Sequence, residues 1–276
     1  MTPLPLPGPL VDVHWLARHL DHPDLVVLDV PVGERADGVE PVRGAGVFDL
    51  EGAFSDHRSA LPHTMPSVER FTAAVRELGV GDRSTVVVYD GVGIYSSARA
   101  WWMFRAMGFD RVAVLDGGLP AWEAAGLPRG GRAGDVVPGN FTAVPRPGLI
   151  VDREVVRTAL ADPARAVLDA RTAGRFAGTA PEPREGLRGG HMPGAFNLPF
   201  GSLQQDGRML PVAELRERFG ELVGEREDLV FSCGSGVTAC VLALGADLAG
   251  YDRLAVYDGS WSEWGLRPEL PVVTGE

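Results

Sequence analysis

Residues 228–249 read DLVFSCGSGVTACVLALGADLA, and the order of residue types in this stretch decides the fold class. The apolar run 228–231 is short and made of strand-forming residues, which predicts a β-strand. The apolar pattern over 237–249 predicts a helix, and Gly234 and Gly236 permit a tight turn between the two elements. A strand that turns directly into a helix is typical of a parallel sheet covered by helices on both faces.

The same alternation of elements extends along the chain. Further short apolar runs, which predict strands, lie at 86–89, 112–115 and 254–257. Helical patterns occupy 67–78 and 211–219, and the second is expected to end before Gly220. In parallel sheets of this kind, ligands bind at the carboxyl ends of the strands, which is where Cys233 lies.

The chain also contains an internal repeat. The run LVVLD at 25–29 reappears as AVLD at 166–169, and VAVLDGGLPAW at 112–122 reappears as LAVYDGSWSEW at 254–264. The two copies are separated by about the length of one domain, which indicates a duplicated domain rather than a short solenoid repeat.

The segment between the two copies is rich in Gly and Pro and has no periodicity, as expected of a linker. We therefore expect a first domain at 1–128, a linker at 129–147 and a second domain at 148–276. The predicted fold class is α/β, with two tandem domains that each contain a parallel sheet flanked by helices.

Charge and composition exclude several classes of function. All 26 basic residues are arginine, which excludes chemistry that needs a lysine amine, such as Schiff-base catalysis and the Walker phosphate loop. The net charge of −11 argues against a nucleic-acid partner. No apolar run is long enough to span a membrane, and residues 1–15 lack the features of a signal peptide. Two cysteines do not make a disulfide framework, so we expect a cytoplasmic protein.

Cys233 is the candidate nucleophile. It follows a strand, precedes a helix and is flanked by Ser232 and Gly234, so backbone N–H groups of the turn and the positive end of the helix can stabilise a sulfur anion. Cys240 lies inside the helical pattern, where a free cysteine is usually a small buried apolar residue. The spacing of the two cysteines does not fit a zinc site, and neither a metal nor a cofactor is implied.

Several stretches together resemble one family. CGSGVTA at 233–239 is similar to the active-site loop of the 3-mercaptopyruvate sulfurtransferases, within the two-domain rhodanese superfamily. In the second half, the stretches similar to the catalytic domain are VLDARTAGRFAGTAPEPREG, GHMPGAFNLPF and AVYDGSWSEWG. In the first half, GAGVFDLEGAFSDHRSALPHTMPS and SSARAWWMFRAMGFDRVAVLDGG are similar to the non-catalytic domain. The resemblance covers nearly the whole chain.

The resemblance implies a sulfurtransferase in which the thiolate of Cys233 takes a sulfur atom from a donor and passes the persulfide sulfur to a thiol or to cyanide. In the first half, Asp90 stands at the position that corresponds to Cys233. Since a carboxylate cannot carry the sulfur, we expect only the second domain to be catalytic. Reduced thioredoxin and low-molecular-weight thiols are candidate acceptors.

The resemblance also implies roles for further residues. Arg175 and Arg184 are expected to bind the carboxylate of the donor, because Arg is suited to bidentate carboxylate recognition. Ser235 is expected to relay a proton together with His63 and an acidic residue, which we assign to Glu51. The amides of the loop are expected to stabilise the sulfur anion, through the residues Gly234, Gly236, Val237 and Thr238. His191 fits a structural role in a turn.

The choice of donor follows from the loop. Sulfurtransferases specific for thiosulfate place basic residues directly after the cysteine, whereas Gly234 and Ser235 are neutral here. The expected donor is therefore 3-mercaptopyruvate, with thiosulfate as the alternative. Two other classes use this fold. Dual-specificity phosphatases have an arginine at the position of Ala239, and non-catalytic binding modules typically lack the cysteine.

Overall fold

The computed structural model describes residues 3–31, 33, 39–131 and 135–275 of the chain. The chain divides into two compact units. The first comprises Met1–His57, Met65–Arg146 and Asp206–Met209, and the second comprises Arg58–Thr64, Pro147–Gln205 and Leu210–Glu276. Three residues of the predicted linker, 132–134, lie outside the described residues.

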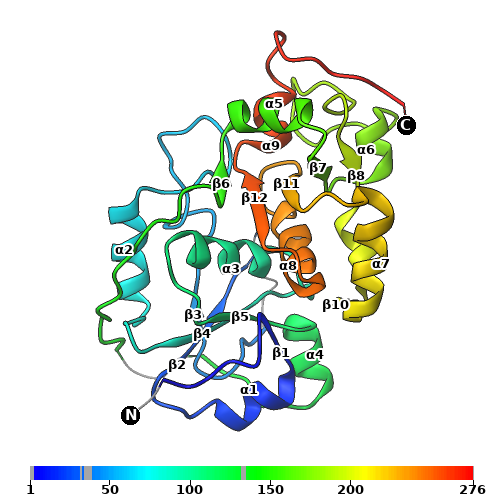
Figure 1. Ribbon diagram of the computed structural model, residues 1–276. Coiled ribbons are helices and arrows are strands. Elements are labelled where there is room, and N and C mark those ends of the chain that lie inside the picture. Colours follow the sequence, from blue (N-terminus) through cyan, green and yellow to red (C-terminus); the bar gives the residue numbers. More distant parts are fainter. Residues whose placement is uncertain (1–2, 32, 34–38, 132–134, 276) are drawn as a thin grey trace. The chain divides into compact units, whose positions relative to one another are not determined.

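The first unit is built on a five-stranded parallel sheet (Figure 1). In the order in which they lie side by side, its strands are β1 (Leu10–Val11), β5 (Val112–Leu115), β4 (Thr85–Tyr89), β2 (Leu25–Asp29) and β3 (Gly46–Val47). Every residue of the central strand β4 is buried. Its continuous apolar sequence is the pattern expected of a strand that is covered on both faces.

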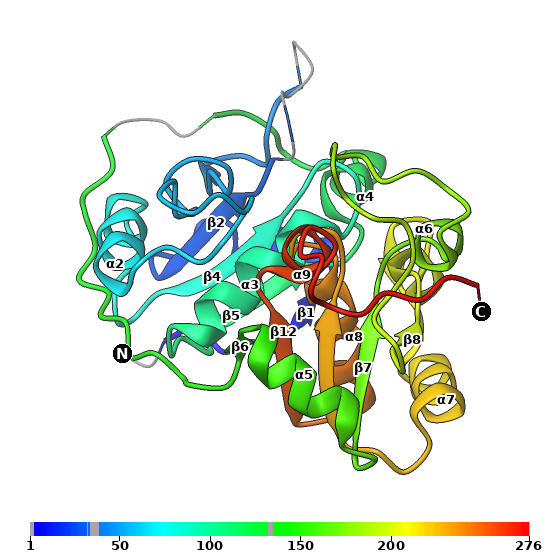
Figure 2. The ribbon, with the colours of Figure 1, turned by 90° about the horizontal axis from the view of Figure 1, so that it is seen from above.

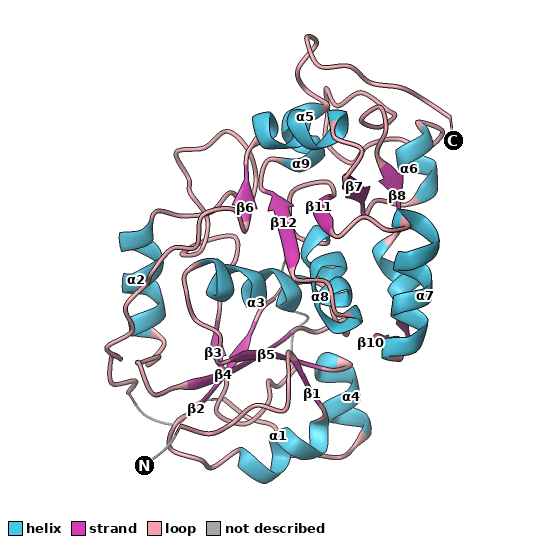
Figure 3. Ribbon diagram, in the orientation of Figure 1, coloured by secondary structure: helices cyan, strands magenta, loops and turns pink. Residues whose placement is uncertain are grey.

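Four helices cover this sheet, namely α1 (Val13–His19), α2 (Val68–Glu77), α3 (Ser96–Ala106) and α4 (Gly118–Ala124). Leu16 of α1 and Trp122 of α4 pack in one buried cluster with Val87 of β4. Figure 3 shows α1 and α4 on one side of the sheet and α3 on the other. On the α3 side, Phe71 and Phe104 pack edge to face with ring centroids 5.6 Å apart. Ser67 caps α2, and its side chain accepts a hydrogen bond from the backbone N–H of Arg70.

The second unit repeats this architecture. Its parallel sheet contains, side by side, β6 (Ile150–Val151), β12 (Arg253–Tyr257), β11 (Asp228–Ser232), β7 (Arg165–Asp169) and β8 (Phe196–Asn197). The order of β12, β7 and β8 across the sheet can be followed in Figure 2. The remaining elements of the second unit are α5 (Arg153–Ala161), α6 (Ala173–Ala177), a 3₁₀ turn (Phe200–Leu203), β9 (Gln204–Gln205), α7 (Val212–Val223), α8 (Ala239–Ala249) and α9 (Ser260–Trp264). The short strand β10 (Arg208–Met209) belongs to the first unit.

The helices of the second unit lie on both faces of its sheet. Val156 of α5 and Trp261 of α9 belong to one buried cluster, whereas α8 packs against α7 and against β11 and β12. Helix α7 continues through Gly220 to Val223, so the prediction that it ends before Gly220 was wrong. It ends at Gly224, whose positive φ of 61° a residue with a side chain rarely adopts. In the described part of the chain, no helix is long and apolar enough to cross a membrane.

The two five-stranded sheets have the same strand order, and the central strand–loop–helix segments of the two units match in length. Strands β4 and β11 each contain five residues, helices α3 and α8 each contain eleven, and a six-residue loop separates strand from helix in both units. We call residues 90–95 the aspartate loop and residues 233–238 the cysteine loop. The predicted fold class, two tandem α/β domains with parallel sheets, is confirmed.

The aspartate loop closes around its own carboxylate. Asp90 is 1 % exposed. Its Oδ1 accepts a hydrogen bond from the backbone N–H of Val92 at 3.0 Å, and its Oδ2 accepts one from Tyr95 N at 2.7 Å. Oδ2 also accepts from the N–H and the hydroxyl of Ser97, at 3.0 and 2.7 Å. This strand–loop–helix turn therefore binds an anion through its backbone donors.

We predict that Asp90→Ala destabilises the protein by about 1–3 kcal/mol, because the substitution leaves buried N–H groups without an acceptor. Urea denaturation followed by circular dichroism measures the change. Asp90→Asn keeps one acceptor oxygen and serves as the matched control, with a smaller expected loss. An Asp90→Ala variant that unfolds at the wild-type urea concentration would contradict the role of the carboxylate.

Candidate active site

Cys233 lies at the carboxyl end of the central strand of the second sheet, directly after β11, and α8 begins six residues later at Ala239. The cysteine is 2 % exposed. Gly236 has a φ of 77°, in the left-handed region, and the corresponding Gly93 of the aspartate loop has a φ of 121°. A side chain at either position would strain the backbone, so glycine is required for the loop to turn there.

The first turn of α9 holds the start of the cysteine loop. The backbone N–H of Cys233 donates to Ser260 Oγ at 3.1 Å, and the carbonyl of Cys233 accepts from Trp261 N at 2.9 Å. The carbonyl of Gly234 accepts from both the N–H and the hydroxyl of Ser262, at 2.9 and 2.6 Å. These bonds fix the backbone on both sides of the nucleophile.

Ser260 accepts the hydrogen bond from the Cys233 N–H while its own backbone is in a strained conformation. Its φ is 47°, in the left-handed region that a non-glycine residue adopts only at a cost of about 1–3 kcal/mol. The first unit has Gly118 at the corresponding position, with a φ of 54°. The serine adds a hydroxyl that donates to the carbonyl of Tyr257 at 2.8 Å while it accepts from Cys233. The strained residue therefore lies where its hydroxyl can hold the backbone of the nucleophile in place.

The backbone donors of the cysteine loop are open to a ligand. Within residues 135–275 and the other described ranges, the amide N–H groups of residues 234–238 donate to no protein acceptor. In the aspartate loop, the amides of Val92 and Tyr95 donate to the Asp90 carboxylate, and these residues correspond to Ser235 and Thr238. The cysteine loop thus offers an anion the donors that the aspartate loop has already used.

Ser235 contacts a histidine. Its Oγ lies 3.0 Å from Nδ1 of His63, and the tautomer of the imidazole decides which atom donates. His63 has a positive φ of 57° and lies in Arg58–Thr64, a segment that belongs to the second unit although it precedes the linker. Glu51, the predicted acidic partner, is an exposed residue of the first unit. Its part in a triad remains a prediction.

The two predicted carboxylate-binding arginines both lie beside Gly234. Arg175 is on α6, and a Cβ atom added to Gly234 would lie 3.2 Å from its Nη2 atom. Nη1 of Arg184 is 3.4 Å from Ser262 Oγ, which in turn donates to the Gly234 carbonyl. Two guanidinium groups are thus gathered at the residue that follows the nucleophile, where they favour a negatively charged ligand.

A buried ion-pair network lies behind Arg175. Glu182 accepts from Nη2 of Arg175 at 2.6 Å and from Nη1 of Arg171 at 2.7 Å, and Arg171 also pairs with Asp169 at 2.6 Å. Burial lowers the pKa of Arg171, but Asp169 and then Glu182 outweigh that effect and leave its pKa above the usual value. Arg171 therefore stays charged although it is buried.

Cys240 and His191, which have no predicted catalytic role, are both buried, and each contacts a backbone carbonyl oxygen. Cys240 is fully buried in α8, and its thiol donates to the carbonyl of Gly236 at 3.3 Å. His191 is stacked on Phe176 with ring centroids 3.7 Å apart, and its Nδ1 lies 2.9 Å from the Phe176 carbonyl oxygen. Among the described side chains, no group of three or more His, Cys, Asp or Glu residues could hold a metal ion.

Sequence reasoning missed Ser260, Ser262 and Glu182. For the two serines, a signal was present in the repeat, since DGGLPAW of the first copy becomes DGSWSEW in the second. Ser260 and Ser262 replace Gly118 and Pro120, and the change at both positions adds the hydroxyls that bind the cysteine loop. Glu182 has no comparable local signal, because its partners Arg171 and Arg175, 11 and 7 positions away, bind it through side chains and share no helix or strand with it.

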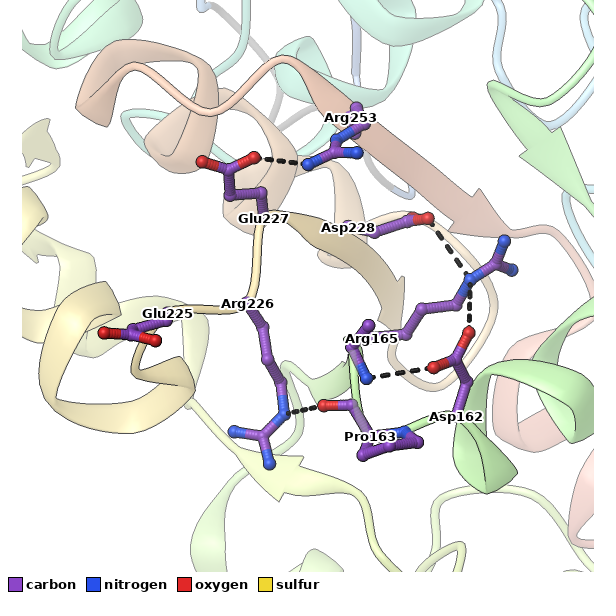
Figure 4. A pocket seen from close by; sticks show the side chains of 9 residues that line it. Asp162, Pro163, Arg165, Glu225, Arg226, Glu227, Asp228 and Arg253 are labelled. Carbon is purple, nitrogen blue, oxygen red and sulfur yellow. Dashed lines mark hydrogen bonds and ion pairs between the residues drawn. The ribbon is translucent and has the colours of Figure 1, made fainter.

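A cavity of about 580 Å³ lies elsewhere in the second unit (Figure 4). Arg165, Asp228 and Arg253, which line it, begin β7, β11 and β12, so the cavity is at the opposite edge of the sheet from Cys233. Its charges are largely paired with each other, as in Arg165 with Asp228 at 3.2 Å. The arrangement does not select a ligand of either charge.

Comparison with known proteins gives consistent matches. The model of the rhodanese-like domain matches residues 12–125 and 152–267. The chain is 38 % identical to thiosulfate/3-mercaptopyruvate sulfurtransferase 1, mitochondrial, of Arabidopsis thaliana, over 97 % of this chain and 79 % of the relative. It is 39 % identical to the 3-mercaptopyruvate sulfurtransferase of Escherichia coli K12, over 95 % of this chain and 96 % of the relative.

Solved structures agree with the sequence matches. The crystal structure of SseA from Escherichia coli, described as a 3-mercaptopyruvate sulfotransferase with the rhodanese fold, superposes with a TM-score of 0.81 at 35 % identity. The superposition covers 93 % of this chain and all of that chain.

We predict that iodoacetamide alkylates Cys233 but not Cys240 in the folded protein. The two cysteines differ in their surroundings, because Cys233 is followed in its loop by amide N–H groups that are open to an anion, whereas Cys240 lies inside α8 and its thiol donates to the Gly236 carbonyl. Mass spectrometry of the intact protein should show one added group, and the unfolded protein should show two. Modification of the folded Cys233→Ser variant would contradict the assignment.

Proposed function

The chain belongs to the rhodanese-like family of sulfurtransferases, and on that premise we propose that it transfers sulfur from 3-mercaptopyruvate to an acceptor through a persulfide on Cys233. The observation that carries the proposal is the meeting of three features at one loop. A cysteine stands at the end of the central strand, the amides that follow it are open, and two arginines lie beside Gly234.

In the first half-reaction, the thiolate of Cys233 attacks the sulfur atom of 3-mercaptopyruvate. A bond forms between the two sulfur atoms, and the carbon–sulfur bond of the donor breaks. The electron pair of that bond goes to the carbon skeleton, which leaves as the enolate of pyruvate and gains a proton. The cysteine is left as a persulfide, and no external oxidant or reductant takes part.

The proton for the enolate comes from Ser235. Its hydroxyl is 3.0 Å from His63 Nδ1, so a protonated imidazole can replace the proton that the serine gives up. Glu51 is proposed as the acidic residue that supports His63, as the resemblance implies. The open amides of the cysteine loop stabilise the sulfur anion before and after the transfer, an electrostatic role of residues Gly234, Gly236, Val237 and Thr238.

Arg175 and Arg184 bind the carboxylate of the donor. The guanidinium of Arg175 lies next to Gly234, and that of Arg184 contacts Ser262, which is bonded to the Gly234 carbonyl, so a donor held by its carboxylate presents its sulfur close to Cys233. Each arginine forms charge-assisted hydrogen bonds that are stronger than those of a neutral donor.

Thiosulfate is the alternative donor, and the name of the Arabidopsis relative includes both donors. The loop supports mercaptopyruvate, because Gly234 and Ser235 leave no basic side chain directly after Cys233 to attract a dianion. A side chain at position 234 would also approach the guanidinium of Arg175. A loop suited to thiosulfate would therefore require a different position of Arg175.

In the second half-reaction, a thiolate or cyanide attacks the outer sulfur of the persulfide and regenerates the thiolate of Cys233. Reduced thioredoxin and low-molecular-weight thiols fit the role of acceptor. Cys233 and Cys240 are not joined in a disulfide, which is consistent with a reducing compartment such as the cytoplasm. The reaction proceeds on the cysteine alone, without a cofactor or metal.

The proposal is tested by Cys233→Ser. This variant should fold normally and lose all turnover of 3-mercaptopyruvate, while Cys240→Ser should keep most activity because its hydroxyl can still donate to the Gly236 carbonyl. The assay measures pyruvate and sulfide in the presence of dithiothreitol. Intact mass after incubation with donor alone should show one added sulfur in the wild type. Full activity of Cys233→Ser would end the proposal.

The donor is tested by Arg175→Leu and Arg184→Leu. Either substitution removes a charge-assisted contact worth about 1.5–3 kcal/mol, which corresponds to a loss of about 10- to 150-fold in kcat/KM for mercaptopyruvate. The loss should appear mainly in KM, because the carboxylate is remote from the breaking bond. Thiosulfate has no carboxylate, and its turnover should suffer less. Equal losses for the two donors would contradict carboxylate binding by these arginines.

A further inference from the structure

Four charged side chains of alternating sign lead from the end of β7 to the cysteine loop: Asp169, Arg171, Glu182 and Arg175. Asp169 and Arg171 are joined by three contacts between Arg171 Nε or Nη2 and the carboxylate, at 2.6–3.1 Å. Arg171 Nη1 donates to Glu182 Oε1 at 2.7 Å. Arg175 donates to Glu182 through Nη2 at 2.6 Å and through Nε at 3.2 Å.

The inner end of this chain is rigid. The side chains of Asp169 and Arg171 are fully buried, and that of Glu182 is 2 % exposed. The guanidinium of Arg171 also lies over the ring of Trp261, with its carbon 4.0 Å from the centroid, and donates to the Gly190 carbonyl at 2.8 Å. The Glu182 carboxylate is therefore held on its inner side by Arg171, a buried side chain that is itself bound to Asp169, the Gly190 carbonyl and Trp261.

Arg175, at the outer end of this row of charged side chains, lies beside the cysteine loop. The side chain of Arg175 is 23 % exposed, and its Nη2 faces Gly234. Since Nε and Nη2 are both used by Glu182, the remaining corner of the guanidinium, Nη1, has no protein partner among the described residues. One edge of the guanidinium is thus fixed, and the other is available to a ligand.

We infer that Glu182 is a positioning residue for donor binding: it holds Arg175 in the orientation that presents Nη1 to the donor's carboxylate before the donor arrives. The inference rests on the proposed function, in which Arg175 binds that carboxylate. An unrestrained arginine has several rotatable bonds, and ordering it on binding reduces affinity. Glu182 orders the side chain during folding instead.

Glu182 also acts on the choice of donor. The four side chains carry two positive and two negative charges, so Arg175 adds no uncompensated charge to the site. Glu182→Gln removes one negative charge and leaves the site more positive. A dianion such as thiosulfate gains more from that change than a monocarboxylate does.

The test is a double-mutant cycle with Arg175→Leu, Glu182→Gln and the combination, assayed with both donors. Glu182→Gln should raise the KM for 3-mercaptopyruvate by about 3- to 30-fold with kcat nearly unchanged, and should not reduce kcat/KM for thiosulfate. In the Arg175→Leu background, Glu182→Gln should have no further effect on KM. Glu182→Asp retains a carboxylate and should recover part of the loss.

Two controls separate this role from a structural one. Glu185 is exposed in the same segment, so Glu185→Gln removes a charge nearby and should leave the KM values unchanged. Thermal unfolding of each variant shows whether it is folded at the assay temperature. If Glu182→Gln does not fold, the same cycle with Glu182→Asp decides the question, with a smaller KM effect that must again vanish in the Arg175→Leu background.

The outcomes distinguish failure of the positioning role of Glu182 from failure of carboxylate binding by Arg175. If Arg175→Leu raises KM selectively for mercaptopyruvate but the effect of the Glu182 substitution is the same with and without Arg175, the positioning role is overturned and carboxylate binding stands. Equal losses with both donors for Glu182→Gln also overturn it. If Arg175→Leu itself leaves KM unchanged, carboxylate binding by Arg175 and the role of Glu182 fail together, while Cys233 remains testable by its own variants.

Discussion

An anion at the end of a buried parallel strand must be met by donors, and the backbone of one short loop supplies them in each unit. The loop can form because Gly93 and Gly236 adopt positive φ angles, which lets the chain turn from strand to helix within six residues. In each unit, the helix after the next strand, α4 or α9, also donates a hydrogen bond to the first residue of this loop. The N–H of Leu119 binds the carbonyl of Asp90 in the first unit, as that of Trp261 binds the carbonyl of Cys233 in the second.

Much of this arrangement could be predicted from the sequence, because it depends on local patterns. The run DLVFS is buried in β11, and the apolar segment after Thr238 is α8, as strand and helix periodicity require. The repeat predicted two similar domains, and the two sheets do have the same strand order. Comparison of the copies then placed Asp90 and Cys233 in equivalent loops, and the matching lengths of strand and helix on both sides agree with that alignment.

The rest of the site depends on contacts between residues far apart in the chain, for which no local pattern exists. Ser235 and His63 are 172 positions apart, and Arg58–Thr64 belongs to the second unit although it precedes the linker. Glu182 is difficult to predict for a different reason, since its partners Arg171 and Arg175 are only 11 and 7 positions away. An acidic residue between two prolines is typical of an exposed turn, and only the fold reveals that Arg171 and Arg175 enclose its carboxylate. Side-chain networks of this kind follow from tertiary packing rather than from periodicity.

The Asp90 carboxylate makes the two units differ in how the backbone donors of their loops are satisfied. An anion that is part of the polypeptide has no dissociation constant, so the first unit is complete from the moment it folds. The second unit has no carboxylate at this position, and among the described residues the amides of 234–238 donate to no protein acceptor. On the mechanism proposed above, the anion that they stabilise is the sulfur on Cys233, whose size changes as the cysteine takes up a sulfur atom and gives it away. Resistance of the second unit to heat or protease should therefore follow its sulfur load, whereas that of the first unit should not.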